Sequence, residues 1–264
     1  MRIQITLQNE RLIRLPIDHY HLLRGAIFDR LERSDPDYAR FVHDEGYIAE
    51  AGKPHRFKLF TYSALRVPKS NRRFAQGQLE IAPGYVTWVL SSPKEDFLRH
   101  EVIGLLAKND AVTIGGQPFR LIALDGLPDP AFSEHMAFTC LTPFVAAVKS
   151  ETHTTPRYLR PADGAALSEA VRVNAVRKYR ALHGKEPGRN DLTLTLSQAY
   201  LDRDAHGGTK KITLSGSGGS IDVIGTLAPL TLKGSPELIQ IAYECGLGEK
   251  NSSGLGMLEV DARA

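Results

Sequence analysis

The sequence contains few of the residues from which metal and nucleophile sites are built. Two cysteines, Cys140 and Cys245, occur among 264 residues, far apart and without a Cys-x-x-Cys pair. No His-Glu-x-x-His, Gly-x-Ser-x-Gly or Walker sequence occurs, and no run of carboxylates suits a magnesium site. We therefore expect a reduced, cytoplasmic protein that uses neither a metal nor another cofactor.

A long apolar segment and a strong excess of one charge are also absent. No apolar run approaches the roughly 18 residues expected of a membrane span, and residues 1–7 alternate like a strand instead of forming the core of a signal peptide. The formal net charge of +3 is too small to identify a partner by itself. The sequence therefore predicts no membrane partner, and any nucleic-acid surface has to come from a local cluster of charge.

The order of predicted elements repeats once along the chain. The first half is predicted as strand 2–8, helix 19–32 with Asp18 as its N-cap, strand 57–63, a strand pair across 78–91, helix 93–108 and strand 112–124. The second half is predicted as strand 136–147, helix 165–181, strands near 192–202, 211–214 and 221–232, helix 236–243 and strand 256–260. Each half follows the β-α-β-β-α-β pattern. We therefore predict an α+β fold of two tandem ferredoxin-like domains, 1–126 and 136–264, with a linker at 127–135.

Residues 245–260 read CGLGEKNSSGLGMLEV, in which two Gly-x-Gly pairs bracket a polar run. Closely spaced glycines let backbone N–H groups approach an anion. The familiar dinucleotide and Walker loops run from strand to helix, whereas this one runs from a helix to a strand. One glycine after a helix is ordinarily a cap, but four of them indicate a phosphate contact. The predicted contacts are Gly246, Gly248, Lys250, Asn251, Ser252, Ser253, Gly254 and Gly256.

Residues 51–79 carry seven Lys and Arg side chains and no acidic residue. Such a segment neutralises phosphates and releases counterions, although a merely solvated loop is the alternative. The aromatic residues Phe57, Phe60, Tyr62 and Phe74 interleave with the charges and could stack on bases, but alternation in a strand would bury half of them. The predicted nucleic-acid contacts are Arg56, Arg66, Lys69, Arg72 and Arg73, and Lys53 belongs to the same basic segment. The candidates in the second half are Arg157, Arg160, Arg172, Arg177 and Arg180.

His43 is the histidine best placed for acid–base chemistry. It ends a short helix that begins at Pro36, it precedes Asp44, and it lies near the basic segment in sequence. An imidazole in this setting could exchange a proton near neutrality. A histidine at a helix end is more often structural, and the other histidines fit that plainer interpretation.

The segment GLGEKNSSGLGMLEV is similar to the glycine-rich C-terminal signature of the CRISPR-associated endoribonucleases that process precursor CRISPR RNA, members of the RAMP superfamily. Three N-terminal segments, LPIDHYHLLRGAIFDRL, DPDYARFVHDEGY and FKLFTYS, resemble the opening helix, the histidine segment and the next strand of that family, in the same order. Between about residues 64 and 235 the resemblance rests on the order of the elements alone.

The resemblance implies a metal-independent site beside an RNA cleft between the two domains, built from a histidine, a lysine and often a tyrosine. The histidine matches His43 and the lysine matches Lys58. The tyrosine position holds Phe28, which can neither donate nor accept a proton; the nearby phenols are Tyr20, Tyr38 and Tyr47. The implied reaction is cleavage of precursor CRISPR RNA within its repeats by 2′-OH attack, which leaves a 2′,3′-cyclic phosphate and a 5′-hydroxyl.

Two other functions stay open at this point. A non-catalytic member that holds guide RNA or joins a CRISPR effector complex is favoured by Phe28 and disfavoured by the pair His43 and Lys58. A ferredoxin-like sensor of small molecules would leave the acid-free segment 51–79 unexplained. The expected partner is CRISPR repeat RNA, as precursor and as mature guide, and both a monomer and a homodimer are compatible with the sequence.

Overall fold

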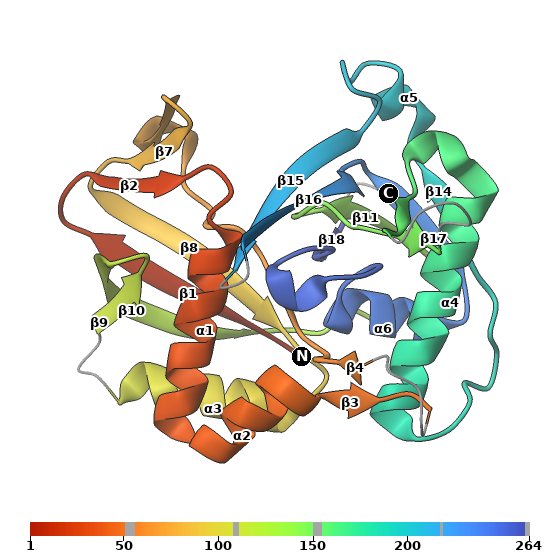
Figure 1. Ribbon diagram of the computed structural model, residues 1–264, viewed down its shortest axis with the longest axis horizontal. Coiled ribbons are helices and arrows are strands. Elements are labelled where there is room, and N and C mark those ends of the chain that lie inside the picture. The colour runs from red at the N-terminus through yellow and green to blue at the C-terminus, as the bar shows by residue number, and fades with distance from the viewer. Residues whose placement is uncertain (51–55, 108–110, 150–154, 217–218, 262–264) are drawn as a thin grey trace.

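The first half of the chain folds around a five-stranded antiparallel sheet with the order β5-β8-β1-β10-β9 (Figure 1). The computed structural model describes residues 1–50, 56–107, 111–149, 155–216 and 219–261, so Lys53 of the basic segment lies outside the described residues. Ile3, Ile5 and Leu7 alternate along β1 and are buried, as a strand with one covered face requires. The elements of this unit are β1 (Arg2–Asn9), α1 (Tyr20–Ser34), β5 (Thr61–Tyr62), β8 (Gly84–Ser91), α3 (Glu95–Leu106), β9 (Ala111–Ile114) and β10 (Gln117–Leu127).

The second half repeats this topology in a four-stranded sheet with the order β14-β17-β11-β18. In both halves the first and third strands of the unit pair in the centre, as in the ferredoxin-like fold, so the predicted fold class is confirmed. The elements are β11 (His135–Cys140), α4 (Gly164–His183), β14 (Leu192–Leu196), β17 (Leu230–Gly234), α6 (Pro236–Cys245) and β18 (Leu258–Val260). β10 ends at Leu127 and β11 begins at His135; the domain limits and the linker at 127–135 stay a prediction.

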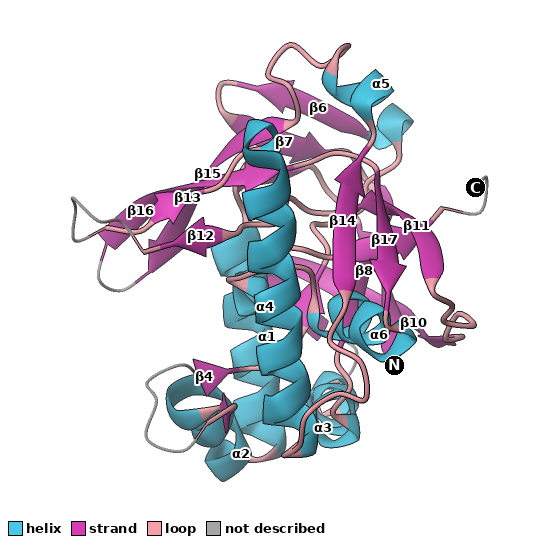
Figure 2. Ribbon diagram, turned by 90° about the vertical axis from the view of Figure 1, so that its right-hand side faces the viewer, coloured by secondary structure: helices cyan, strands magenta, loops and turns pink. Residues whose placement is uncertain are grey.

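Several small elements are added to these two units. The first half carries a three-stranded sheet of β2 (Ile13–Pro16), β7 (Gln78–Ile81) and β6 (Arg72–Ala75), the helix α2 (Pro36–Arg40), and the hairpin of β3 (Tyr47–Ile48) and β4 (Arg56–Phe57). The second half carries α5 (Gln198–Leu201) and two hairpins, β12 (Ala147–Val148) with β13 (Arg157–Tyr158) and β15 (Thr209–Gly216) with β16 (Gly219–Thr226). Figure 2 shows these two hairpins projecting from one side of the molecule.

Two predicted strands of the first half are wrong in detail. The strand expected at 57–63 is broken, because Leu59 adopts a positive φ of 52° between β4 and β5. The chain turns there so that Leu59 enters the core of the second half while Phe60 enters that of the first. The pair expected across 78–91 is also wrong, since β7 pairs with β2 and β6 and not with β8.

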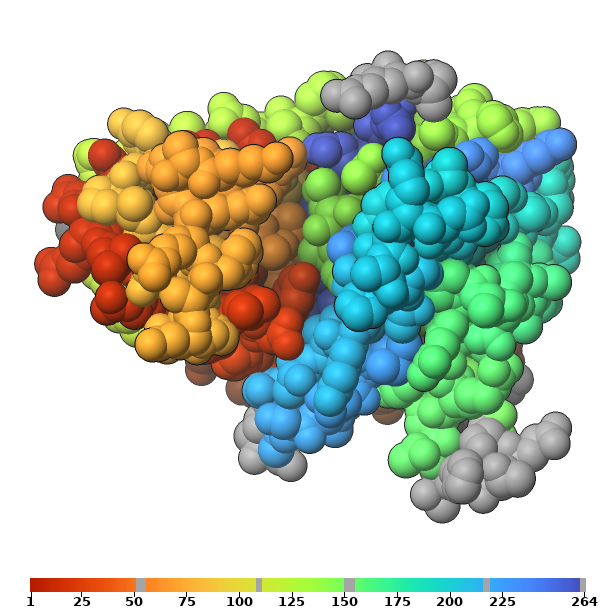
Figure 3. All heavy atoms as spheres, turned by 90° about the horizontal axis from the view of Figure 1, so that it is seen from above, coloured from red at the N-terminus to blue at the C-terminus, as the bar shows by residue number. Residues whose placement is uncertain are grey.

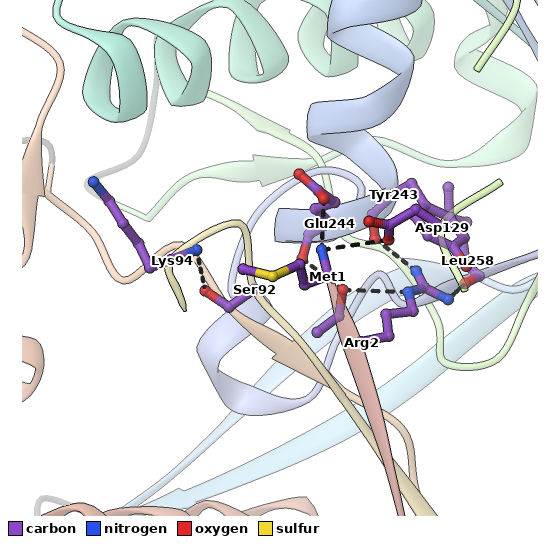
Figure 4. Close-up of polar contacts among 9 residues, drawn as sticks. Met1, Arg2, Ser92, Lys94, Asp129, Tyr243, Glu244 and Leu258 are labelled. Carbon is purple, nitrogen blue, oxygen red and sulfur yellow. Dashed lines mark hydrogen bonds and ion pairs between the residues drawn. The ribbon is translucent and has the colours of Figure 1, made fainter. Parts of the chain in front are cut away.

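The two halves lie side by side (Figure 3), and polar contacts join them. The guanidinium of Arg2, at the start of β1, donates to the carbonyl oxygen of Leu258 at 2.5 Å and of Tyr243 at 2.6 Å, and it lies 3.3 Å from the centre of the Tyr243 ring (Figure 4). Asp18 does not cap α1 as predicted. Its carboxylate accepts from the Thr213 N–H at 3.2 Å and so joins the turn before α1 to β15. These contacts fix the relative position of the halves.

Among the described residues, no helix combines the length and the apolar character needed to cross a bilayer.

Candidate functional site

A π-helical turn and a short hairpin bring His43 and Lys58 together. α2 continues into a π-helical turn at Phe41–Glu45, which ends at Gly46. Gly46 has a φ of 64°, and a Cβ there would lie 2.8 Å from the Phe57 carbonyl oxygen. Glycine therefore allows β3 to pass close to β4. As a result the Lys58 ammonium donates to the carbonyl oxygen of His43 at 2.6 Å, although the two residues are 15 positions apart.

The His43 ring is exposed to solvent and is held by one carboxylate. Its Nδ1 lies 2.6 Å from Oδ1 of Asp44, and the side chain is 63% exposed. A carboxylate accepts hydrogen bonds, so Nδ1 carries the proton and Nε2 is the nitrogen available to a substrate. The hydrogen bond from His43 is also the main reason why the pKa of Asp44 is lowered.

Phe28 lies beside both predicted catalytic residues. Its ring makes an edge contact with His43, with 5.1 Å between ring centres, and Lys58 Nζ lies 5.2 Å from its centroid. A pocket of about 270 Å³ next to His43 is lined by Phe28, Glu32, Pro36, Ala39, Arg40, His43 and Asp44. In the part of the chain that the structure describes, no tyrosine lines this pocket.

The three tyrosines named as alternatives lie in other environments. Tyr20 packs against Gly254. Tyr38 stacks on His100 at 4.7 Å, and Tyr47 contacts Phe41 edge-on at 5.2 Å. None of these contacts reaches His43, so in the described part of the chain none of these three phenols takes the place of the one that Phe28 lacks.

The charge of Lys58 is influenced by burial and by a second cation. Partial burial is the main cause that lowers the pKa of Lys58, and Arg24 of α1 lowers it further. Arg24 precedes Phe28 by four residues and therefore shares its face of the helix. Sequence analysis missed Arg24, although this spacing from the Phe28 position could have identified it.

A second pocket, also about 270 Å³, opens between the two halves beside Lys58. The first half contributes residues 56–60, and the second half contributes α4 and the glycine-rich loop. Its exposed or partly exposed cations are Arg56, Lys58, Arg177 and Lys250. Glu249 is the single carboxylate among the described lining residues. Such a lining is suited to bind an anion.

The glycines of the C-terminal loop allow close packing of the backbone. A Cβ on Gly248 would collide with the carbonyl oxygen of Val145, and one on Gly256 would collide with that of Leu247. A Cβ on Gly254 would lie 2.6 Å from the Tyr62 ring. The amides of Gly254 and Gly256 are also occupied, because they donate to Asn251 and to Pro143 at 2.8 Å each. These two amides are therefore not free to bind a phosphate.

Asn251 also has an internal role. It is buried, and its Nδ2 donates to the carbonyl oxygens of Leu247 at 3.0 Å and Leu255 at 2.9 Å. Lys178 donates to its Oδ1 at 2.6 Å. Among the predicted loop contacts, Lys250 and Ser252 line the pocket with accessible side chains, and Ser253 is partly exposed beside them.

The predicted basic segment is divided among three places. Arg56 and Lys58 lie at the pocket, whereas Arg66 pairs with Glu259 at 3.1 Å. Arg72 and Arg73 lie on β6 of the small sheet, at the opposite end of the first half from β3 and β4 (Figure 1), and Lys69 lies in the 3-10 turn at Lys69–Asn71 that precedes β6. One RNA strand therefore has to extend over both ends of the first half to meet all of them.

The second-half arginines divide in a similar way. Arg177 lines the pocket. Three of the others pair with carboxylates: Arg157 with Asp163, Arg172 with Glu169, and Arg180 with Glu50 and Glu186. Arg160 is exposed, and its backbone N–H donates to Oδ2 of Asp163 at 2.7 Å. Arg177 is therefore the second-half candidate best placed to meet a ligand of the pocket.

Two family profiles match adjacent parts of the chain. The profile of CRISPR associated protein Cas6, C-terminal, matches residues 127–260, and that of CRISPR-associated protein Cas6, N-terminal, matches residues 14–123. The chain belongs to the Cas6 family. The matched segments include both predicted catalytic residues and the glycine-rich loop of this Cas6 chain.

Curated relatives and solved structures agree with this assignment. The CRISPR-associated endoribonuclease Cas6 1 of Methanocaldococcus jannaschii is 25% identical over 98% of this chain and 92% of its own. The CRISPR-associated endoribonuclease-like protein Cas6nc of Pyrococcus horikoshii is 24% identical over 93% of each. A structure described as an RAMP protein binding different RNA substrates superposes over 99% of both chains, with a TM-score of 0.79 and 21% identity.

Proposed function

We propose that this Cas6-family chain is an endoribonuclease that cleaves precursor CRISPR RNA within its repeats. The observation that carries the proposal is the direct contact of Lys58 with the His43 backbone, beside a cation-lined pocket that both halves build. A general acid–base and a fixed cation are the two groups that RNA transesterification needs. The relatives with endoribonuclease names support the same conclusion.

In the proposed reaction, the 2′-hydroxyl attacks the adjacent phosphorus while the bond to the 5′-oxygen breaks. His43 accepts the proton of the attacking hydroxyl or donates one to the leaving oxygen through Nε2, since Nδ1 is held by Asp44. Lys58 stabilises the additional negative charge of the transition state. The products are a 2′,3′-cyclic phosphate and a 5′-hydroxyl, and no step requires a metal.

The pocket between the halves is proposed to bind the RNA backbone near the cut. Arg56, Arg177 and Lys250 supply positive charge on three of its sides, from β4, α4 and the glycine-rich loop. Their contacts with phosphate release counterions and favour binding at low salt. The exposed basic residues of the small sheet are proposed to extend the RNA-binding surface to the other end of the first half.

Phe28 supports a second candidate function, a non-catalytic protein that holds guide RNA or joins an effector complex. The ring occupies the place next to His43 and Lys58 without a hydroxyl. If the missing phenol limits the rate, Phe28→Tyr should raise cleavage by about a hundredfold, the lower end of the effect of a positioned acid–base group. Phe41→Tyr, on the neighbouring π-helical turn, serves as the control, and single-turnover cleavage is the measurement. An unchanged rate in Phe28→Tyr would show that the phenol is dispensable.

The decisive experiment maps the ends of a labelled cognate repeat RNA after incubation in EDTA. Wild type, His43→Ala and the matched control His135→Ala, whose ring is exposed on β11, are compared. We expect a cyclic-phosphate end from wild type and His135→Ala, and none from His43→Ala, which still binds RNA. Cleavage that needs Mg²⁺, or a plain 3′-hydroxyl product, contradicts the mechanism; tight binding without cleavage by wild type favours the guide-holding function.

A further inference from the structure

Lys178 of α4 is a buried lysine that the proposed reaction does not use. Its side chain is 3% exposed. Nζ donates to the carbonyl oxygens of Gly246 and Gly248 and to Oδ1 of Asn251, at 2.6 Å each. All three acceptors belong to the glycine-rich loop. An ammonium has three N–H donors, so each donor has one partner.

The arrangement requires the charged form of the amine. Burial lowers the pKa of Lys178 to about 8, so the amine keeps its proton at neutral pH. A neutral amine would offer two N–H groups to three oxygens. A buried charge is costly. The charge of Glu249 favours the protonated amine, and the hydrogen bonds to three oxygens satisfy the ammonium directly.

The contacts of Lys178 continue directly to the accessible tip of the loop. The carbonyls of Gly246 and Gly248 point inward to the ammonium, and the next amide, of Glu249, donates to Val145 at 2.7 Å. Lys250 then adopts a left-handed φ of 57° and accepts from the Ser253 amide at 3.0 Å. A non-glycine residue in this conformation is strained, and such residues cluster at functional sites. It carries the one cation that the loop presents to the pocket.

We propose that Lys178 is a positioning residue for RNA binding: its ammonium acts as an internal cation that shapes the glycine-rich loop and thereby aims Lys250 and Ser252 into the pocket. The inference rests on the proposed function in one respect, since it takes the tip of the loop to contact RNA. It assigns the carbonyl groups of Gly246 and Gly248 to the binding of this internal cation. The phosphate contact is then made by the side chains at the tip of the loop.

A double-mutant cycle tests this inference. RNA affinity is measured for wild type, Lys178→Met, Lys250→Ala and the double variant, with Lys233→Met as the matched control because Lys233 is exposed on β17. If Lys178 acts through Lys250, we expect each single change to weaken binding by about tenfold and the double variant to be little weaker than Lys178→Met, since residues of one network are non-additive. If Lys178 only stabilises the fold, folded Lys178→Met should bind RNA as wild type does, and the double variant should lose only as much affinity as Lys250→Ala, which is the additive result.

Amide hydrogen exchange reports on the loop without RNA. Lys178→Met should speed exchange in residues 246–256 and leave β1 and β8 unchanged, because the loss of one buried cation is local to the loop. If Lys178→Met does not fold, Asn251→Ala, which removes a single acceptor from the ammonium, takes its place in both experiments.

The outcomes separate the inference from the proposed function. Additive losses, or loop exchange equal to that of wild type, overturn the role of Lys178 alone. If Lys250→Ala binds RNA as wild type does, the proposed contact of the loop tip fails, and the inference fails with it. Faster loop exchange together with non-additive RNA losses supports both.

Discussion

Each half of the molecule buries one cation on the long helix of its unit, and the two cations are satisfied differently. Arg30 of α1 is 3% exposed and pairs with Glu101 of α3, which is fully buried. Lys178 of α4 meets three neutral oxygens of a loop. The first contact joins two helices of a core, whereas the second determines the shape of a backbone segment. The corresponding helices of the two units thus each bury a cation, which contacts another helix in one half and a loop in the other.

The Arg30 pair should give the largest effect on stability. Arg30→Met leaves the buried Glu101 without its partner and should lower the free energy of unfolding by about 3–5 kcal/mol. The double variant Arg30→Met/Glu101→Leu should recover most of this loss, since an apolar pair of similar volume carries no buried charge. Urea unfolding at pH 7 measures both. An equal loss in the two variants would mean that packing on Trp88, which Arg30 overlies at 4.8 Å, dominates.

The glycine-rich loop should tolerate a side chain poorly. Gly256 and Gly116 have nearly the same φ, 76° and 75°, but a Cβ meets backbone atoms at Gly256 and nothing within 4 Å at Gly116. Backbone strain alone should cost Gly116→Ala about 1 kcal/mol, and the added clash should bring Gly256→Ala to about 3 kcal/mol. Chemical denaturation of both variants gives the comparison. Similar losses at the two positions would show that the loop shifts to accept a methyl group.

Glu101 should make stability depend on pH. Burial raises the pKa of Glu101 from its ordinary 4.5 to about 7, although Arg30 acts in the opposite direction. The raised pKa means that its contribution is fully present below about pH 4.5 and is lost as the pH rises to about 7. Relative to Glu101→Gln, wild type should therefore lose about 3 kcal/mol between pH 4.5 and pH 8. The measurement is the free energy of unfolding of both proteins across this pH range. Parallel curves of free energy against pH would contradict the raised pKa of Glu101.

Exposed cations should show the opposite behaviour, with small effects on stability and clear effects on RNA binding. Arg56→Ala and Arg73→Ala should each change the free energy of unfolding by no more than about 0.5 kcal/mol. If each arginine contacts one phosphate, each change should reduce the slope of log affinity against log salt by about one unit. Arg99→Ala, exposed on α3, is the control. An unchanged slope for Arg73→Ala alone would confine the RNA surface to the pocket.

The fold could be predicted because local patterns and topology agree. Alternating Ile3, Ile5 and Leu7 identified β1, and the predicted helices at 165–181 and 236–243 correspond to α4 and α6. The break at Leu59 could not be predicted, because its apolar side chain fits a strand equally well and its turn is required by the core of the other half. The pairing of β7 could not be predicted either, because its partner β2 is distant in the sequence.

The site was predictable only in part. The resemblance named His43 and Lys58, but their contact depends on a π-helical turn and on Gly46, which no periodicity indicates. Lys178 could not be found, since a lysine within a helix is normally exposed. Phe60 and Tyr62 are core residues, whereas Phe74 is 59% exposed. The alternation of aromatic and basic residues in the sequence therefore does not by itself identify a surface on which bases stack.

The contact of Arg2 with the second half has a consequence for synthesis. Arg2 leaves the ribosome long before Tyr243 and Leu258, the residues whose carbonyl oxygens it binds. A nascent chain can therefore form the sheet of its first half early but cannot close the interface, or build the glycine-rich side of the pocket, until β18 has been made. For most of translation, the growing polypeptide consequently carries His43 and Lys58 without the part of the pocket that the second half contributes and that would hold an RNA beside them.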